Sequence, residues 1–94
     1  MLGIYRDTIM AGPDFFTTPV AETVDSTGLK CPEPIMMIRN ALRKVEPGTC
    51  LRLLATDPST LRDIPIMCRF MDHNLISQEL RADVYEFVIA RGSS

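Results

Sequence analysis

The sequence predicts an α/β two-layer sandwich, in which one face of a four-stranded mixed sheet carries two helices. Three observations lead to this fold class. Two segments repeat apolar residues at helical spacing, four others have the composition or alternation of strands, and turn-forming residues separate them. Their order along the 94 residues is β-α-β-α-β-β, and right-handed crossover connections place both helices on the same side of the sheet.

The first three elements are expected to be a strand, a helix and a second strand. The strand covers residues 21–25, and the helix runs from the Cys31-Pro32-Glu33-Pro34 segment to about Lys44. Prolines suit the first helical turn, where a missing amide hydrogen costs little. The buried stripe of this helix is expected to consist of Ile35, Ile38, Ala41, Leu42 and Val45. Residues 49–55 form the next strand, and its core face is expected to hold Leu51, Leu53 and Ala55.

The second half is expected to contain one helix and a pair of strands. The helix begins near Asp63, which serves as its cap, because Pro65 is typical of a first turn. Its expected core-facing residues are Leu61, Ile64, Cys68 and Met71. Strands at residues 74–80 and 84–91 then pair around a turn at Ala82 and Asp83. In the last strand the expected core residues alternate as Tyr85, Phe87 and Ile89.

Composition and charge exclude several classes of protein. Ten basic and twelve acidic side chains leave a net charge of −2, which does not favour binding to a nucleic acid. No apolar run approaches the roughly 20 residues of a membrane span, and the N-terminus lacks the features of a signal peptide. We therefore expect a cytoplasmic protein that does not bind a membrane. Its three cysteines are widely spaced, which favours free thiols over a disulfide framework.

Residues 1–20 are expected to form an N-terminal extension, and residues 21–94 a single domain. The extension shows no sustained hydrophobic period, so we expect it to be disordered. An alternative is that part of it covers the sheet face without helices, which Leu54 and Val88 are expected to make partly apolar.

Cys31 is the strongest candidate for a chemical role. The start of a helix offers unpaired amides and a partial positive charge, which favour the reactive thiolate. Lys30 adds to this effect and Glu33 opposes it, so we expect a modest lowering of the thiol pKa. Pro32 and Pro34 stiffen the backbone around the sulfur. The alternative is a cysteine that only packs near the helix start.

The other candidates for chemistry are weaker. The single histidine, His73, lies far along the chain and is expected to be structural or solvent-exposed. It does not supply the base of a cysteine hydrolase. The cysteines at positions 50 and 68 form no Cys-x-x-Cys pair, so we expect neither a metal nor another cofactor. A disulfide oxidoreductase is also disfavoured, because Pro34 stands where a resolving cysteine would be.

Four sequence blocks together are similar to the TusA (SirA-like) sulfur-carrier family, and most of all to its TusA branch. They are Asp25-Ser-Thr-Gly-Leu-Lys-Cys31-Pro-Glu-Pro34, Asp57-Pro58, Arg62-Asp63-Ile64-Pro65 and Phe70-Met71-Asp72-His73, and the similarity covers roughly residues 21–92. The resemblance implies the same two-layer fold and a persulfide on Cys31, with Lys30, Pro32, Glu33 and Pro34 as the supporting motif.

The resemblance also implies a function. A cysteine desulfurase would donate the sulfur, and a downstream relay protein would accept it for 2-thiolation of the tRNA wobble uridine. The chain itself would be a stoichiometric carrier with sulfurtransferase-type chemistry, without direct contact to tRNA. Alternatives are a carrier for molybdenum-cofactor synthesis or sulfur oxidation, and a non-catalytic interaction or RNA-binding domain of the same fold.

A carrier needs a surface that fits its partners. Met36 and Phe70 lie off the expected buried stripes, and an adaptable methionine beside a reactive thiol suits a docking surface. Turn formation is the default role of Asp57, with partner contact as a second possibility. The expected docking residues are Met36, Arg39, Arg43, Asp57, Phe70 and Met71.

Overall fold

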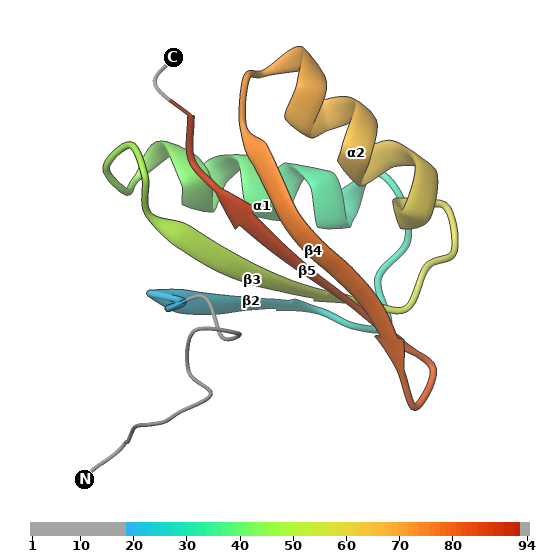
Figure 1. The fold of residues 1–94 in the computed structure, drawn as a ribbon. Helices are drawn as coiled ribbons and strands as arrows, with labels where there is room; N and C mark the ends of the chain where they lie inside the picture. The colour runs from blue at the N-terminus through green and yellow to red at the C-terminus, as the bar shows by residue number, and fades with distance from the viewer. Residues whose placement is uncertain (1–18, 93–94) are drawn as a thin grey trace, which may run out of the picture.

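The computed structural model describes residues 19–92 and contains the predicted order of elements. These are β2 (Glu22–Ser26), α1 (Glu33–Arg43), β3 (Cys50–Ala55), α2 (Thr60–Phe70), β4 (Asn74–Arg81) and β5 (Val84–Ala90). Figure 1 shows both helices over the same face of the sheet. The predicted fold class is therefore confirmed.

The four strands form one mixed sheet in the order β2-β3-β5-β4. Strand β2 is parallel to β3, and β5 is antiparallel to both β3 and β4. A parallel pair requires a crossover connection, which α1 provides. Because β2 and β3 are parallel, their C-terminal ends lie at the same edge of the sheet. The loops that follow these two strands therefore lie next to each other, and they carry Cys31 and Asp57.

The core lies between the helices and the sheet. Its fully buried members include Ile38 and Leu42 of α1, Leu51, Leu53 and Ala55 of β3, Ile64 of α2, and Phe87 and Ile89 of β5. The period of two in β3 and the helical stripe of α1 are thus confirmed. On the opposite sheet face Val88 is also buried. Its register partner Arg52 forms an ion pair with Glu86 at 2.8 Å, which joins β3 and β5.

The start of α2 differs from the prediction. The helix begins at Thr60 after Ser59, so Asp63 lies in its first turn and is not the cap. The earlier start places Thr60, Ile64, Met67 and Cys68 on the buried side. Leu61 is consequently 44% exposed and does not belong to the core stripe as expected.

The extension expected at residues 1–20 falls almost entirely outside the described residues, as does the alternative that it covers the sheet.

Within residues 19–92, neither helix has the length and apolar character that crossing a membrane requires.

Ser26 ties the end of β2 to β3. Its side chain is fully buried, and its Oγ donates a hydrogen bond to the Leu54 carbonyl oxygen at 2.6 Å. Ser26→Ala should lower the free energy of unfolding by about 1–3 kcal/mol, because the carbonyl loses a buried partner. Urea denaturation measures this change, and Ser77→Ala, at a half-buried position on β4, is the control. Equal stabilities of the two variants would contradict this role of Ser26.

Candidate functional site

Cys31 lies on the loop between β2 and α1, directly before the helix. Pro32 is the N-cap residue of α1, and Pro34 is buried within its first turn. Lys30 and Glu33 flank this segment and are exposed. Of the three cysteines, Cys31 alone is exposed, whereas Cys50 is half-buried and Cys68 is buried. Burial raises the pKa of the Cys68 thiol to about 11. Cys31 is therefore the thiol that another protein can reach.

Asp57 holds the Cys31 backbone in place. The amide N–H of Cys31 donates to Asp57 Oδ2 at 2.7 Å, and the amide of Ser59 donates to Oδ1 at 3.2 Å. These two hydrogen bonds, that of Cys31 first, lower the pKa of the Asp57 carboxyl. The amide of Gly28 also donates to Thr56 Oγ1 at 2.8 Å, so two contacts join the loops. Asp57 therefore has the structural role of a turn residue and also fixes the position of Cys31.

Asp63 contacts the sulfur itself. The Cys31 thiol donates a hydrogen bond from Sγ to Asp63 Oδ2 at 3.2 Å, and Arg62 Nε donates to Oδ1 at 3.1 Å. Both contacts lower the pKa of Asp63, the one from Cys31 more strongly. Sequence reasoning missed this role, because it assigned Asp63 to the cap of α2.

The expected lowering of the Cys31 pKa is wrong. The hydrogen bond to Asp63 raises the pKa of the thiol, as do desolvation and the negative charges of Asp63 and Asp57, while the Ser59 hydroxyl acts in the opposite direction. A hydrogen bond that the neutral form donates to a carboxylate stabilises that neutral form.

No histidine base accompanies Cys31. His73 is at the junction of α2 and β4, where its Nδ1 accepts a hydrogen bond from the Gly92 amide at 2.9 Å. Among residues 19–92 no three histidine, cysteine or carboxylate side chains are grouped so that they could hold a metal ion. The arrangement offers one exposed thiol on an anchored loop. Such a thiol can exchange sulfur with a partner by attack of its thiolate form.

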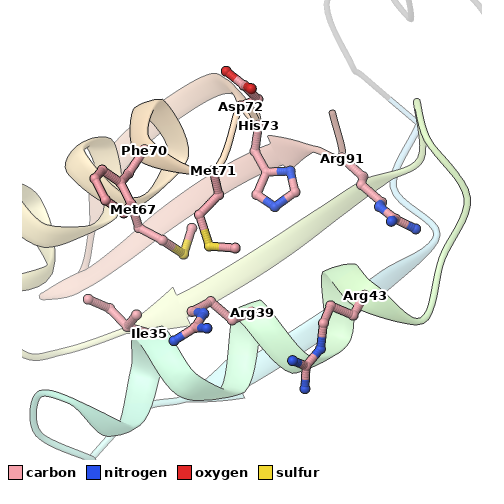
Figure 2. Close-up of a pocket in the computed structure, with 9 residues that line it drawn as sticks. All are labelled: Ile35, Arg39, Arg43, Met67, Phe70, Met71, Asp72, His73 and Arg91. Carbon is pink, nitrogen blue, oxygen red and sulfur yellow. The ribbon is translucent and has the colours of Figure 1, made fainter. Parts of the chain in front are cut away.

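A groove lies between α1 and α2 on the helical face (Figure 2). Its volume is about 840 Å³, and its lining residues are Ile35, Arg39, Arg43, Met67, Phe70, Met71, Asp72, His73 and Arg91. Met67 and Met71, on the side of α2, point toward α1, and three arginines border the groove on the side of α1 and β5. The groove therefore combines apolar surface with positive charge.

The expected docking residues fall into three places. Arg39, Arg43, Phe70 and Met71 line the groove. Met36 is 49% exposed on α1, and Asp57 belongs to the Cys31 loop. Sequence reasoning did not place Met67 or Arg91 at this surface. Arg91 follows β5 directly, and only the sheet order brings it beside the end of α1, where it donates to the Val45 carbonyl oxygen.

Fold and site together define a SirA-like two-layer protein with one exposed cysteine before its first helix. A crystal structure of a SirA-like protein from Desulfitobacterium hafniense superimposes with a TM-score of 0.69 at 23% identity, covering 77% of this chain and 99% of that one. At that identity the likeness shows the fold. The sulfur carrier protein TusA of Pseudomonas fluorescens is 49% identical over 75 residues, which are 80% of this chain and 90% of that protein.

The model of the family Sulfurtransferase TusA matches residues 22–91. This match and the identity to the Pseudomonas protein show that the chain belongs to the TusA family of sulfur carriers, as the sequence blocks predicted.

Proposed function

We propose that the protein accepts sulfane sulfur on Cys31 as a persulfide and passes it to a cysteine of another protein. The observation that carries this proposal is the exposure of Cys31 on a loop anchored by Asp57, in a chain of the sulfur-carrier family. A reactive cysteine must be accessible, and a transfer between proteins needs its position to be reproducible. A cysteine desulfurase is the proposed donor, and a downstream relay protein is the acceptor.

The exchange conserves sulfur and electrons. The Cys31 thiol loses its proton to solvent, and the thiolate attacks the outer sulfur of the donor's persulfide. A bond forms between Cys31 Sγ and that sulfur, while the sulfur–sulfur bond of the donor breaks. The donor leaves as a thiolate and takes up a proton. Delivery repeats the same step with Cys31 as the leaving group, so the carrier needs no metal and no other cofactor.

The groove between α1 and α2, together with Met36, is the proposed docking surface. Phe70 is 89% exposed and lines the same groove as Arg39 and Arg43, so a large apolar side chain is open to a partner there. Aromatic, methionine and arginine side chains are the types enriched in protein interfaces. Both α1 and α2 begin near the Cys31 loop, whereas Arg43 and Phe70 of the groove are the last residues of these helices. The proposed partner therefore extends along both helices from the groove to the thiol.

The proposed pathway is 2-thiolation of the tRNA wobble uridine. Expression of the chain in a bacterium that lacks its own carrier of this family should restore 2-thiouridine in tRNA, and Cys31→Ser should not. Mass spectrometry of tRNA nucleosides measures this result. Restored activity of molybdenum enzymes or of sulfur oxidation, with 2-thiouridine still missing, would favour those pathways instead. Full restoration by Cys31→Ser would favour a non-catalytic domain.

A further inference from the structure

Two carboxylates approach Cys31 from the loop and helix that follow β3. Asp57 accepts the hydrogen bond of the Cys31 amide, and Asp63 accepts the hydrogen bond of the thiol. The second contact is unexpected in a cysteine that must react, because a thiolate cannot donate it. The geometry therefore stabilises the unreactive form of the sulfur.

We propose that Asp63 is a positioning residue that holds Cys31 as a protonated thiol in the free, empty carrier. This inference deepens the proposed function and rests on it for its biological meaning, although its chemistry can be measured without any partner. The hydrogen bond from Sγ to Oδ2 fixes the sulfur against the first turn of α2 and keeps the proton on it. Arg62 holds the other carboxylate oxygen, which keeps Asp63 ionised and oriented toward the sulfur.

The remaining charged groups around the site do not cancel this effect. Asp57 adds a second negative charge from the loop before α2, and Glu33 lies on the first turn of α1. Lys30 adjoins Cys31, and its charge lowers the pKa of Asp57. Arg62 pairs with Asp63, and the Ser59 hydroxyl favours the thiolate. The pKa of Cys31 is nevertheless raised, and the hydrogen bond to Asp63 is the largest cause.

The hydrogen bond to Asp63 makes the exposed sulfur react selectively with a docked donor over diffusing molecules. A diffusing electrophile or oxidant meets a thiol that is mostly protonated and therefore reacts slowly. A docked persulfide donor has a high effective concentration at the sulfur, which compensates for the small thiolate fraction. When Cys31 takes up sulfur, its hydrogen bond to Asp63 is lost. The persulfidated Sγ carries sulfur in place of hydrogen and no longer donates to Asp63.

The test is the pH dependence of Cys31 alkylation by iodoacetamide, followed by peptide mass spectrometry so that Cys50 and Cys68 do not contribute. The alkylation rate should rise with pH, and the midpoint of this rise should lie at higher pH for the wild-type protein than for a synthetic peptide of residues 26–36. Asp63→Asn should shift the midpoint to lower pH and accelerate alkylation at pH 7.5 by about two- to fivefold, the range of a surface charge interaction. Asp63→Ala should act in the same direction, which separates loss of the carboxylate from the amide donor that Asn introduces.

Glu33→Gln is the matched control, since it neutralises a neighbouring carboxylate in the same way and should shift the midpoint less. Thermal unfolding shows whether each variant is folded. A wild-type midpoint at or below that of the peptide would overturn the proposal without any variant. Unchanged midpoints in folded Asp63→Asn and Asp63→Ala would also overturn it. Neither result depends on a desulfurase, so a failure of the sulfur-carrier role would be seen separately, as absence of loading.

Discussion

Replacing Cys31 with serine should reduce sulfur loading from a cysteine desulfurase to background. A serine hydroxyl cannot form the persulfide, and neither of the other two cysteines is as accessible as Cys31. Transfer of radiolabelled sulfur from cysteine, followed on a non-reducing gel, measures the loss. Cys31 is exposed, so the variant should melt at nearly the wild-type temperature.

Cys50→Ser is the control for this experiment, because it removes a half-buried thiol far along the chain from Cys31. It should load sulfur as the wild type does. Labelling of Cys31→Ser at the wild-type level would disprove the role of Cys31. Loss of labelling in a folded Cys50→Ser protein would show that a second thiol takes part.

Phe70→Glu should weaken binding to the desulfurase by roughly tenfold or more, the cost typical of removing an aromatic anchor from an interface. The replacement places a negative charge in the groove, which Arg39 and Arg43 also line, and it would repel the acidic partner that these arginines would favour. Phe70 is 89% exposed, so thermal stability should change little. Met36→Glu should act in the same direction, since Met36 is exposed one turn after Pro32, next to the Cys31 loop. Calorimetric titration of the desulfurase with each variant measures the effect.

Ile66→Glu is the matched control for the docking experiment. It introduces the same charge on the same helix at a 51% exposed position that does not line the groove. It should leave the affinity nearly unchanged. Equal weakening by Ile66→Glu and Phe70→Glu would show a general effect of charge and would contradict docking at the groove.

The parts of the fold that were predictable are those in which burial follows a regular period. In α1 the stripe containing Ile38 and Leu42 faces the core, and in β3 Leu51 and Leu53 alternate with more exposed neighbours. The predicted start of α2 is wrong because Pro65, a residue typical of a first turn, does not mark the first turn of this helix. The structure places Pro65 inside the helix, which begins at Thr60. The preference of proline for the first helical turn is weak evidence when tertiary packing favours an earlier start of the helix.

The sequence identified Cys31 as the candidate cysteine more reliably than it predicted the surroundings of the sulfur. The position of Cys31 before a proline-rich helix start indicated the candidate, but local rules gave the wrong direction for its pKa. The decisive contact joins Cys31 to Asp63, 32 residues further along the chain. It depends on the parallel pairing of β2 and β3, which brings the two following loops together. A signal was present in retrospect, because Asp57 and Asp63 both follow the strand that pairs with β2.

The most direct test of the sulfur-carrier role is the intact mass of the protein after incubation with a cysteine desulfurase and cysteine. One added sulfur, about 32 Da, is expected from the single exchange step. Peptide mapping should place it on Cys31, and treatment with a reductant should remove it. An unchanged mass with an active desulfurase, or sulfur found on Cys50 or Cys68 instead, would contradict the account.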